Sequence, residues 1–115
     1  MTKYKRGDVV LVSFVFSDEA GAKRRPAVII SSEHYNQQRQ EAVISAITSR
    51  IDRTLVGDYL INNWQESGLL LPSVATGIIR TIKQSMISIK LGTISREDMK
   101  GIDRQLRIVL GLNSK

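Results

Sequence analysis

Cysteine is absent from this chain of 115 residues. Its absence excludes disulfide bonds, thiol nucleophiles and thiolate metal sites together. Histidine occurs once, at His34, so a ribonuclease mechanism that needs two histidines is excluded within one subunit. The carboxylates are scattered without the spacing of a metal site, which disfavours a metal-dependent nuclease. We therefore expect no metal ion and no cofactor.

Long apolar runs and aromatic side chains are also scarce. No apolar stretch approaches the roughly 18 residues of a membrane-spanning helix, and no signal-peptide cleavage pattern follows the basic residues at the N-terminus. We therefore expect a cytoplasmic protein without a membrane partner. Aromatic residues are 5% of the chain, which limits base stacking as a binding device.

Positive charge, by contrast, is in excess. Seventeen Lys and Arg stand against eleven Asp and Glu, which gives a formal net charge of +6. Such a balance attracts polyanions, but it does not choose among RNA, DNA and an acidic protein. The length and the apolar fraction of 42% fit one packed domain, so we expect residues 1–115 to form a single domain.

Short apolar segments separated by polar turns predict a mainly β fold. The predicted strands cover residues 9–16, 25–31, 42–48, 55–61, 72–82 and 85–90. The polar segment 32–41 fits either a turn or a short helix. Many short strands in so small a chain favour a compact barrel over an open α/β sheet.

The last part of the chain has the period of a helix. Ser95 can cap it, with Glu97 and Asp98 in the first turn. Apolar residues then recur at intervals of three and four, at Met99, Ile102, Leu106, Val109 and Leu110. Gly111 supplies a stop signal. The pattern predicts an amphipathic helix of about four turns packed against the barrel.

Two polar groups stand beside predicted strands. The triplet Lys23-Arg24-Arg25 precedes the second strand, where a fixed guanidinium can bind phosphate and stabilise a pentacoordinate phosphorane. Taken alone, the triplet also fits a solvated basic turn that protects a strand edge. Thr48 and Ser49 end the third strand, and their hydroxyls can donate to a phosphate or accept from a ribose 2′-hydroxyl. A threonine there is also simply a good β-former.

Three segments together resemble a known family. Residues 6–12 (RGDVVLV), 23–31 (KRRPAVIIS) and 45–49 (SAITS) are similar in order and composition to segments of the MazF/PemK toxin endoribonucleases, and the resemblance runs from about Arg6 to Leu112. It implies an SH3-like small β-barrel of the MazF/PemK/CcdB type with a C-terminal helix. It also implies a homodimer that cleaves single-stranded RNA, chiefly mRNA, sequence-specifically and without metal, leaving a 2′,3′-cyclic phosphate and a 5′-hydroxyl. An acidic antitoxin protein would inhibit it.

The resemblance assigns roles to individual residues. Arg25, directly before a proline, corresponds to a catalytic arginine of the family, and Thr48 to a hydroxyl residue that faces it at the scissile phosphate. Glu19, or its neighbour Asp18, corresponds to a loop acid that assists the 2′-hydroxyl. From their charge or hydroxyl groups and their positions we expect further RNA contacts at Lys23, Arg24, Ser49, Arg50, Arg53 and Arg80.

One departure from the family pattern leaves an alternative open. Some relatives place a catalytic arginine and aspartate five and three residues before the position of Arg80, whereas this chain has Ala75 and Gly77 there. A chain without that pair could bind RNA or a protein without cutting, as a non-catalytic member of a fold that gyrase-poisoning toxins share. A DNA-binding regulator ranks lower, because no helix-turn-helix pattern is present.

Overall fold

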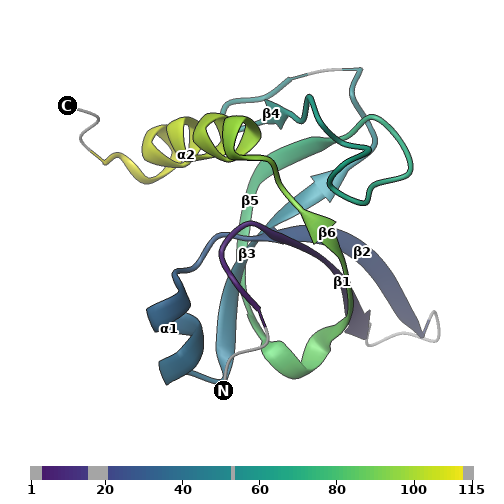
Figure 1. Ribbon diagram of the computed structural model, residues 1–115, viewed down its shortest axis with the longest axis vertical. Helices are drawn as coiled ribbons and strands as arrows, with labels where there is room; N and C mark the ends of the chain where they lie inside the picture. Colours follow the sequence, from purple (N-terminus) through teal and green to yellow (C-terminus); the bar gives the residue numbers. More distant parts are fainter. Residues whose placement is uncertain (1–3, 16–20, 53, 113–115) are drawn as a thin grey trace.

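The computed structural model describes residues 4–15, 21–52 and 54–112 (Figure 1). Its strands are β1 (Asp8–Val15), β2 (Ala22–Ile29), β3 (Glu41–Thr48), β4 (Tyr59–Leu60), β5 (Val74–Lys83) and β6 (Ile87–Thr93). Helix α1 (Glu33–Gln38) joins β2 to β3, and the short 3-10 helix η1 (Gln84–Met86) joins β5 to β6. Helix α2 (Arg96–Leu110) follows β6.

All strand pairs are antiparallel and form one sheet in the order β4-β5-β3-β2-β1-β6. The sheet curves until it looks barrel-like in Figure 1, with α2 across one end and α1 beside the other. Register shifts in the β1–β6 and β3–β5 pairs contribute to this curvature, because bulges bend and twist strands. The predicted small β-barrel with a C-terminal helix is confirmed, as a sheet that does not close.

The sheet buries apolar side chains on both faces. Neighbouring residues of a strand point to opposite faces, so Val9 belongs to one buried cluster and Val10 and Val12 belong to another. The first cluster includes Ile102 of α2, and the second includes Ile82 of β5. Burial on both faces explains why β1 is an almost continuous apolar run rather than an alternating one.

Helix α2 is confirmed with nearly its predicted bounds. The Ser95 hydroxyl accepts the Asp98 backbone N–H at 3.1 Å, and Gly111 ends the helix with a left-handed φ of 69°. Met99 and Leu106 pack against the first cluster beside the buried Ile102. No helix in the described part of the chain is long and apolar enough to cross a membrane.

Three predicted strand boundaries are wrong. Residues 55–58 form a turn, so only Tyr59–Leu60 of the predicted fourth strand pairs with β5. Gly57 has a φ of 98°, and the Asp58 carboxylate accepts the Leu55 N–H at 3.0 Å, as is typical of turns. Strand β2 begins at Ala22, so the basic triplet lies inside the strand and not before it. The predicted segment 85–90 begins within η1.

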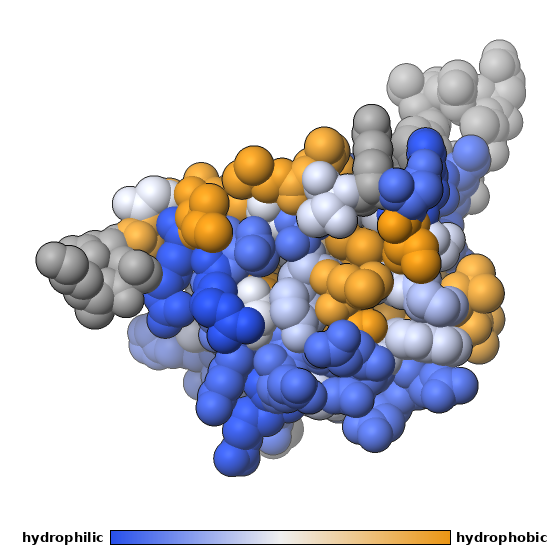
Figure 2. Space-filling model, turned by 90° about the horizontal axis from the view of Figure 1, so that it is seen from above, coloured by the Kyte–Doolittle hydropathy of each residue, from blue (hydrophilic) through white to orange (hydrophobic). Residues whose placement is uncertain are grey.

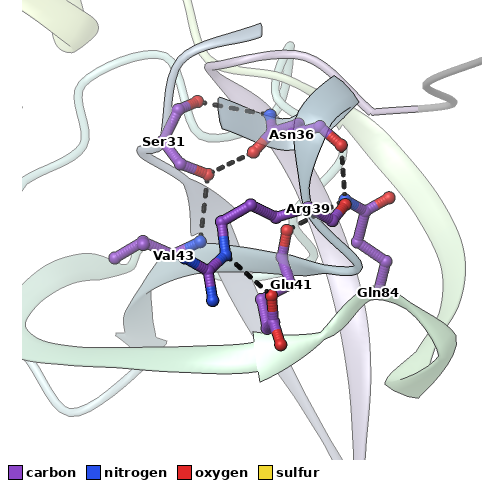
Figure 3. A network of polar contacts seen from close by, with 6 residues as sticks. All are labelled: Ser31, Asn36, Arg39, Glu41, Val43 and Gln84. Carbon is purple, nitrogen blue, oxygen red and sulfur yellow. Dashed lines mark hydrogen bonds and ion pairs between the residues drawn. The ribbon is translucent and has the colours of Figure 1, made fainter. Parts of the chain in front are cut away.

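A network of hydrogen bonds connects α1 to β3 and to η1 (Figure 3). The Ser31 hydroxyl accepts the Val43 N–H at 2.9 Å and donates to the Asn36 side-chain oxygen. The Gln84 side-chain amide donates to the carbonyl oxygens of Asn36 and Glu41, both at 2.9 Å. Because Asn36 is only 2% exposed, these bonds satisfy groups that burial would otherwise leave unpaired. Of the two forms predicted for residues 32–41, the structure shows the short helix.

Candidate functional site

Arg25 and Thr48 lie at facing positions of two paired strands. Strands β2 and β3 pair with Ala27 opposite Ala46 and Val28 opposite Ser45. The same register, continued beyond Ala27, sets Arg25 against Thr48. Residues that face each other in an antiparallel pair project to the same side of the sheet. The fold therefore directs the guanidinium and the hydroxyl to one surface.

Three hollows of the surface meet at Thr48. The arginine hollow is lined by residues from four strands, among them Phe14, Arg25, Thr48, Ile78 and Arg80. The leucine hollow contains Arg25, Thr48 and Ser49 together with five leucines, Leu11, Leu69, Leu70, Leu71 and Leu91. The loop hollow lies between β3, β5 and the segment that follows β3, and its lining includes Thr48, Arg50, Asp52, Leu55, Val56, Asp58 and Ile78. Thr48 lines all three hollows and Arg25 lines two.

Two guanidinium groups border the arginine hollow. Arg25 is exposed, and Arg80 lies over the Phe14 ring with its Cζ atom 4.8 Å from the ring centre. None of the ion pairs formed by the described residues involves Arg25 or Arg80. A guanidinium always carries its charge, and its fork of donors matches the oxygens of a phosphate.

The backbone orients the Thr48 hydroxyl. Its Oγ1 accepts the Arg50 N–H at 3.1 Å. This contact uses one lone pair of the oxygen and leaves the hydroxyl hydrogen free to donate. A half-buried hydroxyl donor beside exposed guanidinium groups can hold a phosphate oxygen, so the chemistry of the site fits a phosphodiester ligand.

The other predicted site residues fall into three groups. Ser49, Arg50 and Arg80 each line one of the hollows that contain Thr48. Lys23 and Arg24 are exposed on β2 and line none of the three, and Arg24 points to the face opposite Arg25 because side chains alternate along a strand. Glu19 and Arg53, together with Asp18, lie outside the described residues, so their roles stay predictions.

A family model fits nearly the whole chain. The model of the PemK-like, MazF-like toxins of type II toxin-antitoxin systems matches residues 5–110. The chain belongs to this family. Toxins of the PemK/MazF family are endoribonucleases, and the resemblance seen in the sequence is thereby confirmed.

Solved structures share the fold at low sequence identity. A mycobacterial endoribonuclease in complex with its cognate antitoxin is 22% identical, with a TM-score of 0.77 over 97% of this chain and 99% of that one. MazF in a MazE-MazF structure from Deinococcus radiodurans is 18% identical, with a TM-score of 0.80 over 96% and 97%. The Mycobacterium tuberculosis toxin MazF-mt6 is 17% identical, with a TM-score of 0.71 over 90% and 98%.

The structure accounts for the two positions at which this family member departs from the expected pattern. Ala75 is 2% exposed within the first cluster, where a long charged side chain would not fit. A Cβ atom at Gly77 would lie 3.2 Å from the Val56 carbonyl oxygen and 3.3 Å from the Gly57 Cα. The turn at residues 55–58 thus covers position 77. The Asp58 carboxylate of this turn lies beside Gly77, and its Oδ1 accepts the Gly77 N–H at 3.3 Å.

Sequence reasoning missed Phe14, Asp52 and Asp58 as residues that line the hollows. Gly57-Asp58 is a turn signal that could have identified the last of them.

Neither a carboxylate nor an imidazole lines the arginine or leucine hollow within the described ranges, and His34 is exposed on α1. The described residues contain no group of three possible metal ligands. Among the aromatic residues, Tyr59 and Trp64 pack against the first cluster.

Proposed function

We propose that this family member is a sequence-specific, metal-independent endoribonuclease toxin that cleaves single-stranded RNA, chiefly mRNA. The observation that carries the proposal is that Arg25 and Thr48 border the same two hollows in a chain of the PemK/MazF family. In the proposed reaction the ribose 2′-oxygen attacks the adjacent phosphorus and the 5′-oxygen leaves. The products are a 2′,3′-cyclic phosphate and a 5′-hydroxyl.

In this mechanism Arg25 stabilises the charge that develops on the phosphate oxygens during attack. A guanidinium placed beside these oxygens lowers the energy of the phosphorane and can donate a hydrogen bond to the departing 5′-oxygen, which takes up a proton from water to give the 5′-hydroxyl. Thr48 donates a hydrogen bond to the same phosphate and fixes its position. A guanidinium hardly ever loses a proton in a protein, so another group must accept the 2′-hydroxyl proton. We assign this step to Glu19, with Asp18 as its neighbour.

The proposed partners are RNA and an acidic antitoxin protein. The net charge of +6 favours the approach of both, because each is a polyanion. The similar mycobacterial endoribonuclease is in complex with its cognate antitoxin, and the similar Deinococcus radiodurans protein is MazF with MazE. We propose that an antitoxin inhibits this chain by covering Arg25 and its neighbouring hollows, and that the protein acts in the cytoplasm, where mRNA is translated.

We also propose that the toxin is a homodimer. The end of α2 exposes three large apolar side chains, because Ile108, Leu110 and Leu112 are 58%, 57% and 58% exposed. Figure 2 shows apolar surface along one margin of the molecule and hydrophilic surface along the opposite margin. An apolar patch of this kind favours contact with another protein.

Sedimentation of a charged variant tests the dimer. Leu110→Asp should convert a wild-type dimer to a monomer. Ile89→Asp, on β6 and 53% exposed, is the matched control and should remain dimeric. A wild-type protein that sediments as a monomer at high concentration would contradict the dimer proposal.

RNA cleavage in the presence of EDTA tests the enzymatic proposal. The purified protein is incubated with a long mRNA, and the new 5′ ends are mapped and tested for a free hydroxyl. We expect cuts at defined sequences that disappear in Arg25→Ala and persist in Arg104→Ala, which removes an exposed arginine of α2. Cleavage that needs added magnesium, or that Arg25→Ala leaves undiminished, would refute the mechanism.

One observation favours a second candidate function, which is binding without cleavage. The described lining of the arginine and leucine hollows contains no group that can accept a proton at neutral pH, and the turn at 55–58 covers Gly77. The same experiment separates the two functions. RNA that is retained by the wild-type protein without new 5′ ends would favour the binding protein.

A further inference from the structure

The loop hollow adjoins the proposed cleavage site but has no role in the proposed chemistry. It has a volume of about 400 Å³ and shares Ala46, Thr48 and Ile78 with the arginine hollow, so the two adjoin along β3 and β5. The leucine hollow shares Arg25 and Thr48 with the arginine hollow. An RNA strand whose scissile phosphate lies between Arg25 and Thr48 therefore borders both the loop hollow and the leucine hollow at Thr48.

These two flanking hollows differ in chemistry. The leucine hollow is apolar apart from Arg25, Thr48 and two serines. The loop hollow combines apolar walls with Arg50 and Asp52, whose Nη2 and Oδ2 atoms are 3.6 Å apart. Their side chains are 75% and 67% exposed, and so loose a surface pair is weak. Its donors and acceptors are therefore available to a ligand.

The far wall of the loop hollow is fixed in place. The Asp58 carboxylate accepts the N–H groups of Leu55 and Gly77, at 3.0 and 3.3 Å, and so ties the turn to β5. A Cβ atom at Gly57 would lie 2.6 Å from Cγ2 of Val109, which shows that α2 packs directly on this turn. A hollow with rigid walls can select a ligand shape at a low cost in conformational entropy.

We propose that the loop hollow reads one base next to the cleaved phosphate, with Asp52 and Arg50 as the reading groups. This inference rests on the proposed function, because its ligand is RNA. Bases in single strands expose N–H donors, which a carboxylate accepts, and ring or carbonyl acceptors, to which a guanidinium donates. Guanine fits best, since its N1–H and N2–H groups lie side by side and O6 lies next to them. The leucine hollow offers no such pairs and reads its base weakly.

A randomised RNA library tests this asymmetry. For the wild-type protein the mapped ends should show a guanine preference of about tenfold at one position beside the cut and a weaker preference on the other side, in keeping with one good base contact. Asp52→Asn replaces an acceptor with a donor and should remove most of that preference at that position alone. Glu33→Gln removes the same charge from α1 and should leave every preference unchanged.

Retention of the same library on immobilised protein gives the preference even if the wild-type protein does not cut. Failure to cut would refute the proposed function, while a selective loss in retained sequences with Asp52→Asn would still support base reading. An unchanged preference in Asp52→Asn, or an equal change in Glu33→Gln, would overturn the inference and leave the endoribonuclease proposal intact. Leu70→Ala, at a residue that is 91% exposed, should affect at most the weaker preference and leave the guanine preference unchanged. Loss of the guanine preference in that variant would overturn the asymmetry.

Discussion

The polar cluster around Thr48 and the polar cluster around Asp98 both contain charged side chains, but they use them in opposite ways. Near Thr48, Arg25 and Arg80 border a hollow, and the ion pairs among the described residues include neither. Asp98 is completely buried, and its carboxylate accepts three hydrogen bonds. They come from the Tyr59 hydroxyl at 2.7 Å, the Asn62 N–H at 3.1 Å and the Asn63 N–H at 2.8 Å.

The contrast indicates that unused hydrogen-bonding capacity, rather than charge, separates the candidate binding cluster at Thr48 from the structural cluster at Asp98. Asp98 has few acceptor sites left, and its three donors tie α2 to β4 and to the segment that follows β4. Gly101 allows α2 to pack closely against Tyr59, because a Cβ atom at position 101 would collide with the Tyr59 ring. Among the described residues, no carboxylate pairs with Arg25 or Arg80, so their donors there face the hollow. Four predictions test the contrast, from the largest expected effect to the smallest.

Arg25→Ala should affect activity and leave stability almost unchanged. We expect the cleavage rate to fall by about 100- to 1000-fold, because a charged donor to the phosphorane is lost. The free energy of unfolding should change by less than about 0.5 kcal/mol, because the side chain is exposed. Initial cleavage rates and urea unfolding measure the two effects. A large loss of stability with normal cleavage would place Arg25 among the structural residues.

Asp98→Ala should do the reverse. Three buried donors lose a charged acceptor, so we expect the free energy of unfolding to fall by about 3 kcal/mol. Asp98→Asn keeps one acceptor oxygen, so its free energy of unfolding should fall by less. The cleavage rate per folded molecule, measured at low temperature, should stay close to that of the wild type. Unchanged urea unfolding in Asp98→Ala would show that the buried cluster does not stabilise the fold.

Tyr59 should make stability depend on alkaline pH. Burial, and then the hydrogen bond to Asp98, raise the pKa of Tyr59 to about 12, from about 10 in an unfolded chain. A group with a raised pKa stabilises the fold while it is protonated, so this contribution is complete below about pH 10 and is lost as the pH rises to about 12. Urea unfolding across this range should show a smaller decline for Tyr59→Phe. Parallel declines in both proteins would assign the effect to other groups.

Phe14→Leu should give the smallest effect. The ring of Phe14 supports Arg80, and an exposed cation-π contact contributes about 0.5–1 kcal/mol. RNA binding should therefore weaken by about two- to fivefold, as measured by fluorescence anisotropy. Tyr35→Leu removes the ring beside Arg39 on α1 and should leave RNA binding unchanged. An equal loss of RNA binding in both variants would show that the contact between Phe14 and Arg80 does not contribute to RNA binding.

Prediction from sequence succeeded where the forces are local. Strands β1 and β3 have apolar β-branched runs, and α2 has its cap, its periodic apolar residues and its final glycine within one segment. The prediction for residues 55–61 was wrong because Leu55, Val56 and Tyr59 favour a strand while Gly57 and Asp58 impose a turn. The side-chain bond of one aspartate thus outweighed the β propensity of its neighbours.

The polar clusters also differ in how much of them the sequence predicted. The family resemblance pointed to Arg25 and Thr48, and the structure brings them to shared hollows, while their catalytic roles stay predictions. Asp98 was interpreted as an acid in the first turn of a helix, and its burial was not predicted. Its donors come from residues 35 to 39 positions earlier in the chain, a separation at which no sequence pattern is informative.

By itself, the sequence determined the excess of positive charge, the lack of thiols, the period of each main strand and the two ends of α2. These properties depend on composition or on residues that are neighbours in the chain. Only the tertiary structure decided that three hollows meet at Thr48, that a turn covers Gly77 and that Asp98 is fully hydrogen-bonded. Each of these depends on contacts between distant segments, whose relative positions are fixed only when the sheet pairs and α2 packs against it.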